Sequence, residues 1–249
     1  MDFVELQKNG ETATLTLNRG SVNALNGAVL DQLRARLKAL ENDQEVRAII
    51  LTGSGKFFSF GFDVPEFLSF TKDRFAEFVT NFSDLCAYLF LYPKPVVAAL
   101  NGHAIAGGCV LALTCDYRVM VNEKAKISLN EISFGSAVFA GIAEMLRFCV
   151  GSAKAASILY SGTMYTAEEA KSFGLVDEAT TEQDFMAAAR KAALDLGSKN
   201  PPAFARVKTL LRKPVAEEIQ RREAESIREF IDIWYSETTW ANLQNIKIH

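Results

Sequence analysis

The chain has 249 residues and a mass of 27.4 kDa, which corresponds to one large domain or two small ones. Hydrophobic residues make up 49% and charged residues 23%, a balance typical of globular proteins that excludes disordered, collagen-like and disulfide-scaffold classes. The net charge is −3, so the strongly basic balance of a nucleic-acid-binding protein is missing and no nucleic-acid partner is expected.

The first half of the chain alternates between strand and helix patterns. Polar and apolar residues alternate over 12–17, which predicts a half-buried strand, and apolar residues at helical spacing predict an amphipathic helix over 27–41. Short apolar runs predict further buried strands over 48–51, 95–100 and 117–121, and helices are predicted over 73–91 and 109–115. These alternating elements indicate an α/β core.

The chain after Gly151 has a helical pattern almost throughout. Helices are predicted over 152–160, 166–173 and 183–196, and Thr166 with Glu169 forms the pattern of a capping box. Pro201 and Pro202 are expected to start another helix, and residues 216–243 are charged and helical. We therefore divide the chain into a core over 1–195 and a helical C-terminal region over 196–249.

The sequence contains few features of a metal site, a disulfide framework or a membrane segment. The four cysteines form no C-x-x-C pair, and His103 and His249 are too few for a histidine-rich metal site. The cysteines are expected to be buried thiols in a reducing compartment, which predicts a cytoplasmic protein. The N-terminus does not resemble a signal peptide, and no apolar stretch is long enough to span a membrane, so no membrane partner is expected.

Two glycine-bearing turns are the strongest candidates for a functional site. One covers 57–63 and the other 101–108; each follows a predicted strand, and the second leads into a helix. The N-terminus of a helix carries free backbone N–H groups, and two N–H groups from separate loops can converge on one developing oxyanion. By physics alone a glycine-rich turn is more often only a tight turn, and neither turn has the spacing of a dinucleotide or phosphate loop.

The residues of these turns resemble those of a known family. Residues 55–63 (GKFFSFGFD) resemble the first oxyanion-loop motif of the crotonase, or enoyl-CoA hydratase/isomerase, superfamily. Residues 94–102 (KPVVAALNG), continuing to Asp116-Tyr117-Arg118, resemble the second, and residues 18–25 and 162–176 resemble two further family segments. The similarity covers residues 3–215, and the motifs occur in the family's order.

This resemblance implies a fold, a substrate class and a set of site residues. The implied fold is an α/β spiral of ββα units with a helical C-terminal region that forms trimers, so a homotrimer or hexamer is expected. The implied ligand is an acyl-CoA thioester, with coenzyme A as part of the substrate and no separate cofactor. Phe62 and Gly107 fall where the two oxyanion N–H groups lie. The substrate-binding positions implied by the resemblance are Ser21, Val22, Ala24, Leu25, Lys56, Phe60, Gly61 and Gly108.

The acid–base residues indicate which reaction of the family to expect. The resembled hydratases have one glutamate directly after Gly-Gly-Cys and a second about twenty residues later; here these positions are Val110 and Glu131. Hydration uses two carboxylates around one water, whereas a single carboxylate is sufficient to move a proton between two carbons. The Leu-Asn-Glu motif that ends at Glu131 also resembles the Δ3,Δ2-enoyl-CoA isomerases. We therefore predict an enoyl-CoA isomerase with Glu131 as the proton shuttle.

Other functions and other candidate residues remain open at this stage. An enoyl-CoA hydratase, another acyl-CoA lyase or hydrolase, a non-catalytic acyl-CoA-binding protein and an RNA-binding member of the superfamily are the alternatives. From residue type alone Glu131 is more ordinarily an exposed carboxylate. Glu144 is a possible second carboxylate but is expected to be solvated, Asp63 is expected to cap a helix, and His103 is expected to be a packing residue.

Overall fold

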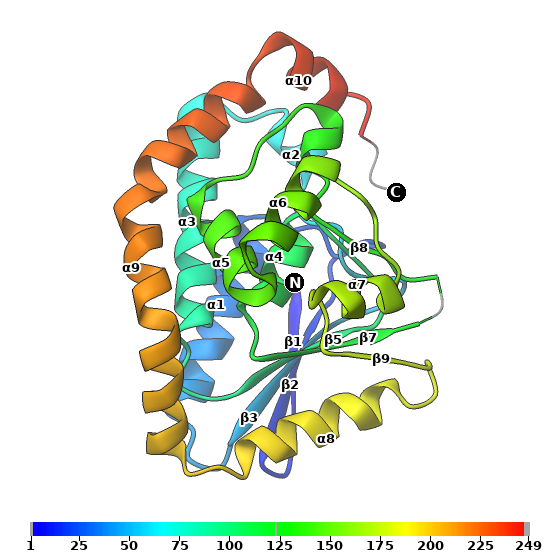
Figure 1. Ribbon diagram of the computed structural model, residues 1–249, viewed down its shortest axis with the longest axis vertical. Coiled ribbons are helices and arrows are strands. Elements are labelled where there is room, and N and C mark those ends of the chain that lie inside the picture. The colour runs from blue at the N-terminus through cyan, green and yellow to red at the C-terminus, as the bar shows by residue number, and fades with distance from the viewer. Residues whose placement is uncertain (1, 123, 247–249) are drawn as a thin grey trace.

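The computed structural model describes residues 2–122 and 124–246 and contains two sheets surrounded by helices (Figure 1). The larger sheet has six strands in the order β1-β2-β3-β5-β7-β9, and the smaller has the order β4-β6-β8. Only the pairing of β1 with β2 is antiparallel within these two sheets. The strands of the larger sheet are β1 (Val4–Asn9), β2 (Thr12–Leu17), β3 (Ala48–Gly53), β5 (Val96–Leu100), β7 (Tyr117–Val121) and β9 (Glu178–Thr180).

The chain winds as a spiral that alternates between the two sheets. After each of β3, β5 and β7 in the larger sheet, the next strand along the chain joins the smaller sheet; these strands are β4 (Phe57–Ser59), β6 (His103–Ile105) and β8 (Ile127–Ser128). One or more helices then return the chain to the larger sheet for its next strand. This arrangement is the α/β spiral of ββα units that the sequence motifs implied. It brings successive strand ends, and the turns that follow them, to the same part of the molecule.

Most of the predicted elements are confirmed, with small shifts at their ends. The helices of the α/β core are α1 (Gly27–Glu41), α2 (Val64–Phe67), α3 (Lys72–Phe90), α4 (Gly107–Thr114), the 3₁₀ helix η1 (Glu131–Phe134) and α5 (Ala140–Val150). The later helices are α6 (Ser152–Ser161), α7 (Ala167–Phe173), α8 (Phe185–Gly197), α9 (Pro201–Trp234) and α10 (Glu237–Leu243). The capping box of α7 is present, with the Thr166 side chain and the Glu169 side chain each bonded to the other's backbone N–H.

The sequence pattern missed several elements, most of them short. Residues 57–59, expected in a loop, form β4, and β1, β6, β8, β9, α2, η1 and α5 were not predicted. Several of these are three residues or fewer, too short to show a period in the sequence. The helix predicted over 109–115 starts two residues earlier, at Gly107, because the glycines there begin the helix instead of preceding it.

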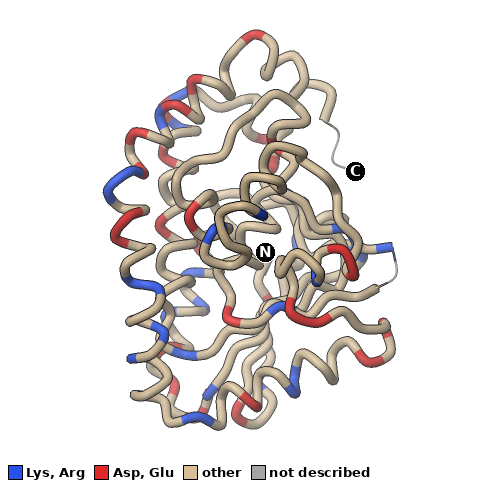
Figure 2. The backbone as a smooth tube through the Cα atoms, viewed as in Figure 1, with Lys and Arg blue, Asp and Glu red and all other residues tan. Residues whose placement is uncertain are grey.

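The C-terminal helices pack on the chain's own core. Helix α9 lies along α3 and α5, and α8 lies against β3, β5 and β7 (Figure 1). Charged residues of both signs follow the length of α9 in Figure 2. The apolar face of this helix is buried within the chain; its members include Ile227, Phe230, Ile231 and Trp234. In the described part of the chain, no helix has the length and apolar character needed to cross a membrane.

A buried ionic cluster attaches α9 to the larger sheet. Asp116 lies just before β7, and its carboxylate contacts Lys208 Nζ at 2.8 Å and Arg212 Nη2 at 3.1 Å, both from α9. The same carboxylate accepts a hydrogen bond of 2.8 Å from the N–H of Val96 at the start of β5. Lys208 and Arg212 are only 5% and 6% exposed, so their charges depend on this carboxylate. Burial lowers the pKa of Lys208 to about 8.

Replacing this carboxylate is expected to destabilise the fold strongly. Asp116→Asn leaves two buried cations without their counter-charge, a loss that typically costs about 3–5 kcal/mol. The matched control is Glu217→Gln, which breaks an exposed pair with Lys213 on the same helix and should cost less than about 1 kcal/mol. Urea denaturation of the wild type and the two variants measures both losses of unfolding free energy. Equal stability of the two variants would show that the buried cluster does not hold α9.

Candidate active site

The two glycine-bearing turns of the sequence lie against each other in the structure. One runs from β4 through Gly61 and Phe62, and the other joins β6 to the start of α4 at Gly107. A Cβ atom on Gly61 would lie 2.8 Å from the carbonyl oxygen of Ile105 and 2.9 Å from the backbone nitrogen of Gly107. Gly61 also has a φ of +96°, which disfavours any residue with a side chain. The sequence therefore needs glycine here so that the two backbones can meet.

Gly108 allows a second close approach between these segments. A Cβ atom at this position would lie 2.3 Å from the carbonyl oxygen of Ser59 at the end of β4. Ala106, directly before α4, takes a φ of +48°, a strained conformation for a residue with a side chain. Such strain is often found at functional sites, where the surrounding structure enforces it. Here the turn aims the N-terminus of α4 toward the loop that carries Phe62.

Two backbone N–H groups are left available where the turns meet. Within the described residues, the N–H of Phe62 and that of Gly107 donate no hydrogen bond to the chain. Gly107 is the first residue of α4, where the helix supplies no acceptor and its dipole favours negative charge. The pair can therefore donate two hydrogen bonds to one oxygen atom of a ligand and stabilise negative charge on it.

Leu25 and Asn23 hold the loop of Phe62 and the segment before it in place, and Asn23 was not among the residues expected at the site. Leu25 pairs with Phe62 as an isolated bridge, with its N–H bonded to the Gly61 carbonyl at 2.7 Å. Asn23, which is buried with a φ of +51°, donates through Nδ2 to the carbonyls of Ser54 and Phe57 at 3.0 and 2.8 Å. Asparagine is enriched at positive φ, which is the only signal of this role in the sequence.

Glu131 begins the short helix η1 and is 7% exposed. Its Oε2 atom has no hydrogen-bond partner, and in the described part of the chain no side chain is bonded to its carboxylate. Burial raises its pKa to about 7, because the charged form loses the hydration it has in water. A carboxylate with this pKa exchanges its proton readily near neutral pH, which suits a general base.

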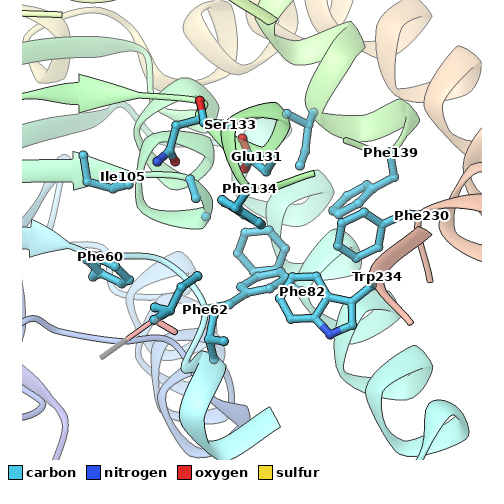
Figure 3. A pocket seen from close by; sticks show the side chains of 16 residues that line it. Phe60, Phe62, Phe82, Ile105, Glu131, Ser133, Phe134, Phe139, Phe230 and Trp234 are labelled. Carbon is cyan, nitrogen blue, oxygen red and sulfur yellow. The ribbon is translucent and has the colours of Figure 1, made fainter. Parts of the chain in front are cut away.

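One cavity of about 280 Å³ brings Glu131 together with the two free N–H groups. Phe62, Gly107 and Glu131 all line it, and Glu131 is the only ionisable side chain among its described lining residues. Figure 3 shows Glu131 above a group of aromatic rings, with Phe60 and Ile105 on one side and Phe139 and Phe230 on the other. The remaining walls are largely apolar and include Val64, Phe82, Ile142, Trp234 and Ile246.

The C-terminal wall of the cavity could not be located from the sequence. Phe230 and Trp234 belong to α9 and Ile246 follows α10, about one hundred residues after Glu131. The helical pattern over 216–243 predicted a helix but not the surface that this helix covers. Among the phenylalanines, Phe60, Phe62 and Phe139 line the cavity, while Phe58 and Phe67 are fully buried in the core.

The residues expected along the coenzyme A moiety lie outside this cavity. Ser21 and Lys56 are exposed on the surface. Val22, Ala24 and Leu25 are buried. The carbonyl of Val22 accepts a hydrogen bond from the N–H of Phe60 at 2.9 Å, and that of Ala24 accepts one from Arg19 at 3.0 Å.

The remaining candidate residues have structural roles in the described chain. Asp63 caps α2 by accepting the N–H of Glu66 at 3.1 Å, as expected. Glu144 was expected to be solvated, which is wrong: it is 9% exposed and is paired with Arg147 and Arg222, away from the cavity. His103 packs its ring against Phe57, as expected. Val110 is buried in α4 and supplies no second carboxylate.

The raised pKa of Glu131 predicts a pH-dependent difference in stability. In the unfolded chain this carboxyl titrates near 4.5, whereas in the folded chain it titrates at about 7. Between these values the folded state keeps a proton that the unfolded state has lost, so the unfolding free energy falls as pH rises through this window. Glu131→Gln has no carboxyl to titrate, so its unfolding free energy does not fall in this way. Relative to the wild type, the unfolding free energy of the variant should rise by about 3 kcal/mol between pH 4 and pH 8. A pH-independent difference in urea denaturation would contradict the shift.

Comparisons with known proteins place the chain in a family context. The family model described as enoyl-CoA hydratase/isomerase matches residues 7–238. A 2,3-dehydroadipyl-CoA hydratase of Escherichia coli is 36% identical over 200 residues, 80% of this chain and 77% of the hydratase. The mouse mitochondrial enoyl-CoA delta isomerase 1 is 31% identical over 230 residues, 92% of this chain and 80% of the isomerase. The crystal structure of human mitochondrial Δ3-Δ2-enoyl-CoA isomerase superposes with a TM-score of 0.92 at 27% identity, covering 97% of this chain and 95% of that one.

Proposed function

This chain belongs to the enoyl-CoA hydratase/isomerase family, and from this premise we propose that it is an isomerase that converts a 3-enoyl-CoA to the 2-trans-enoyl-CoA. The observation that carries the proposal is the lone carboxylate of Glu131 in a cavity with no other described ionisable side chain. Relatives with hydratase names and relatives with isomerase names both match this chain, so the family by itself does not select the reaction.

The proposed reaction begins with polarisation of the thioester. The thioester oxygen accepts hydrogen bonds from the N–H groups of Phe62 and Gly107, which stabilise the negative charge that forms on this oxygen. Glu131 then removes a proton from C2, and the electrons of the C–H bond spread over the dienolate. The protonated carboxyl returns the same proton to C4, so the double bond moves from C3 to C2 and Glu131 is regenerated. Coenzyme A enters as part of the substrate.

The polar groups of the site favour isomerisation over hydration. Hydration needs a water molecule placed between a proton acceptor and a proton donor. Val110 occupies the position at which the resembled hydratases have one of these carboxylates, and it is buried and apolar. Isomerisation needs no water, and a raised pKa near neutrality suits a group that must both take and return a proton.

Product analysis tests this proposal. Purified protein is incubated with a 3-enoyl-CoA. The product is separated by liquid chromatography, and its mass is measured by mass spectrometry. We expect a product of unchanged mass that absorbs as a conjugated 2-enoyl thioester. A product heavier by one water would identify the protein as a hydratase, and no conversion of any chain length would favour a binding role or another acyl-CoA reaction.

A further inference from the structure

The segment that carries Glu131 is held by the C-terminal helix α10. Helix η1 is only four residues long and ends at Phe134, with Gly135 as its C-cap, so it has few hydrogen bonds of its own. The carbonyl of Gly135 accepts a hydrogen bond of 2.6 Å from Thr239 Oγ1, and the carbonyl of Phe134 accepts one of 3.1 Å from Asn242 Nδ2. Both donors belong to α10, more than one hundred residues later in the chain.

Thr239 makes the more constrained of these two contacts. It is 1% exposed, so water does not compete for its hydroxyl. Its Oγ1 accepts a hydrogen bond of 3.1 Å from Ser236 Oγ, which leaves its own single proton directed to the Gly135 carbonyl. A Cβ atom on Gly135 would lie 3.3 Å from Thr239 Oγ1, so the glycine allows this close approach.

The Oε2 atom of Glu131 is not held by a hydrogen bond of its own, so nothing in the described chain fixes that atom directly. The carbonyl of Glu131 accepts the N–H of Ser136 at 3.0 Å, which ties its backbone to the turn that Thr239 contacts. The backbone of Glu131 is therefore tied to the turn at 134–136.

We propose that Thr239 is a positioning residue for Glu131: its buried hydroxyl holds the turn after η1 and so sets where the carboxylate meets the substrate. This inference rests on the proposed function, in which Glu131 exchanges a proton with two carbons of one substrate. Transfer to both carbons requires the carboxylate to stay in one narrow location. Displacement of a reacting group by about 1 Å can cost 100-fold in rate.

The test compares three variants of α10 in steady-state isomerase assays. Thr239→Val keeps the shape of the side chain but removes the hydroxyl, and it should lower kcat by roughly 10- to 100-fold with KM nearly unchanged. Thr239→Ser restores the donor and should recover most of the lost kcat. Thr238→Val is the matched control, because Thr238 is the exposed neighbour on the same helix, and it should behave as wild type. Failure of serine to restore kcat, or equal losses at 238 and 239, would overturn the inference.

A second measurement does not depend on catalysis. The pH dependence of the unfolding free energy is measured for four proteins. These are the wild type, Glu131→Gln, Thr239→Val and the double variant. If Thr239 keeps the carboxylate in its buried position, removal of the Thr239 hydroxyl admits water to Glu131. The pH-dependent difference in unfolding free energy between Glu131 and Glu131→Gln proteins then becomes smaller. An undiminished difference would overturn the inference even if the wild type proved not to be an isomerase. If Thr239→Val does not fold, Asn242→Ala removes the exposed neighbouring contact and should reduce the same difference to a smaller extent; no reduction would again overturn the inference.

Discussion

Glu131→Gln is expected to lower kcat/KM for a 3-enoyl-CoA by roughly 100- to 10,000-fold, the range typical for the loss of a general base. Glutamine has nearly the shape of glutamate but cannot accept the C2 proton. The affinity for acyl-CoA should be almost unchanged, because the rest of the cavity and both free N–H groups remain. Calorimetric titration with a saturated acyl-CoA measures binding, and the absorbance of the conjugated product measures turnover.

The control for this substitution is Glu217→Gln, which makes the same chemical change at an exposed position of α9. Its activity should equal that of the wild type. Retention of isomerase activity in Glu131→Gln would remove this residue from the mechanism and reject the proposed reaction. Loss of activity together with loss of acyl-CoA binding would instead show that the substitution had damaged the cavity.

Deletion of one free N–H group should have the second largest effect. Gly107→Pro removes the N–H donor while keeping a residue that is well tolerated at the first position of a helix. The thioester oxygen then keeps only the N–H of Phe62, and loss of one such donor typically lowers kcat by about 100- to 1,000-fold. The stopped-flow rate of isomerisation measures this loss, and circular dichroism checks the fold.

Gly107→Ala separates the loss of the donor from the addition of a side chain. In either variant the new Cβ atom meets the ring of Phe62 at 3.1–3.2 Å, and the proline ring also places its Cδ atom on the nitrogen in place of the hydrogen. Only the proline variant lacks the N–H group, so the ratio of the two rates reports the loss of this donor together with the added Cδ atom. Equal rates for the alanine and proline variants would show that the N–H of Gly107 does not contact the reacting thioester.

The sequence determined much of the fold because its local patterns agree with the tertiary structure. The alternation over 12–17 and the apolar spacing over 27–41 appear as β2 and α1 with the same ends. Each of these patterns persists for a full period or more, so only one type of secondary structure buries all of its apolar residues on one face. The short strands of the smaller sheet were missed because two or three residues cannot display a period.

Some features of the candidate site could likewise be predicted from neighbouring residues, and others depend on residues far away in the sequence. Phe62, Gly107 and Glu131 were selected because each lies in a short motif that resembles one of the family, and the glycines near Phe62 and Gly107 are ones that the backbone approach requires. The sequence could not show that Glu131 is buried with a pKa of about 7, because burial depends on what else covers the residue. That cover comes partly from Phe230, Trp234 and the α10 contact of Thr239. Only the tertiary structure brings these residues to the site, since no local pattern records which distant surface a buried helix face will contact.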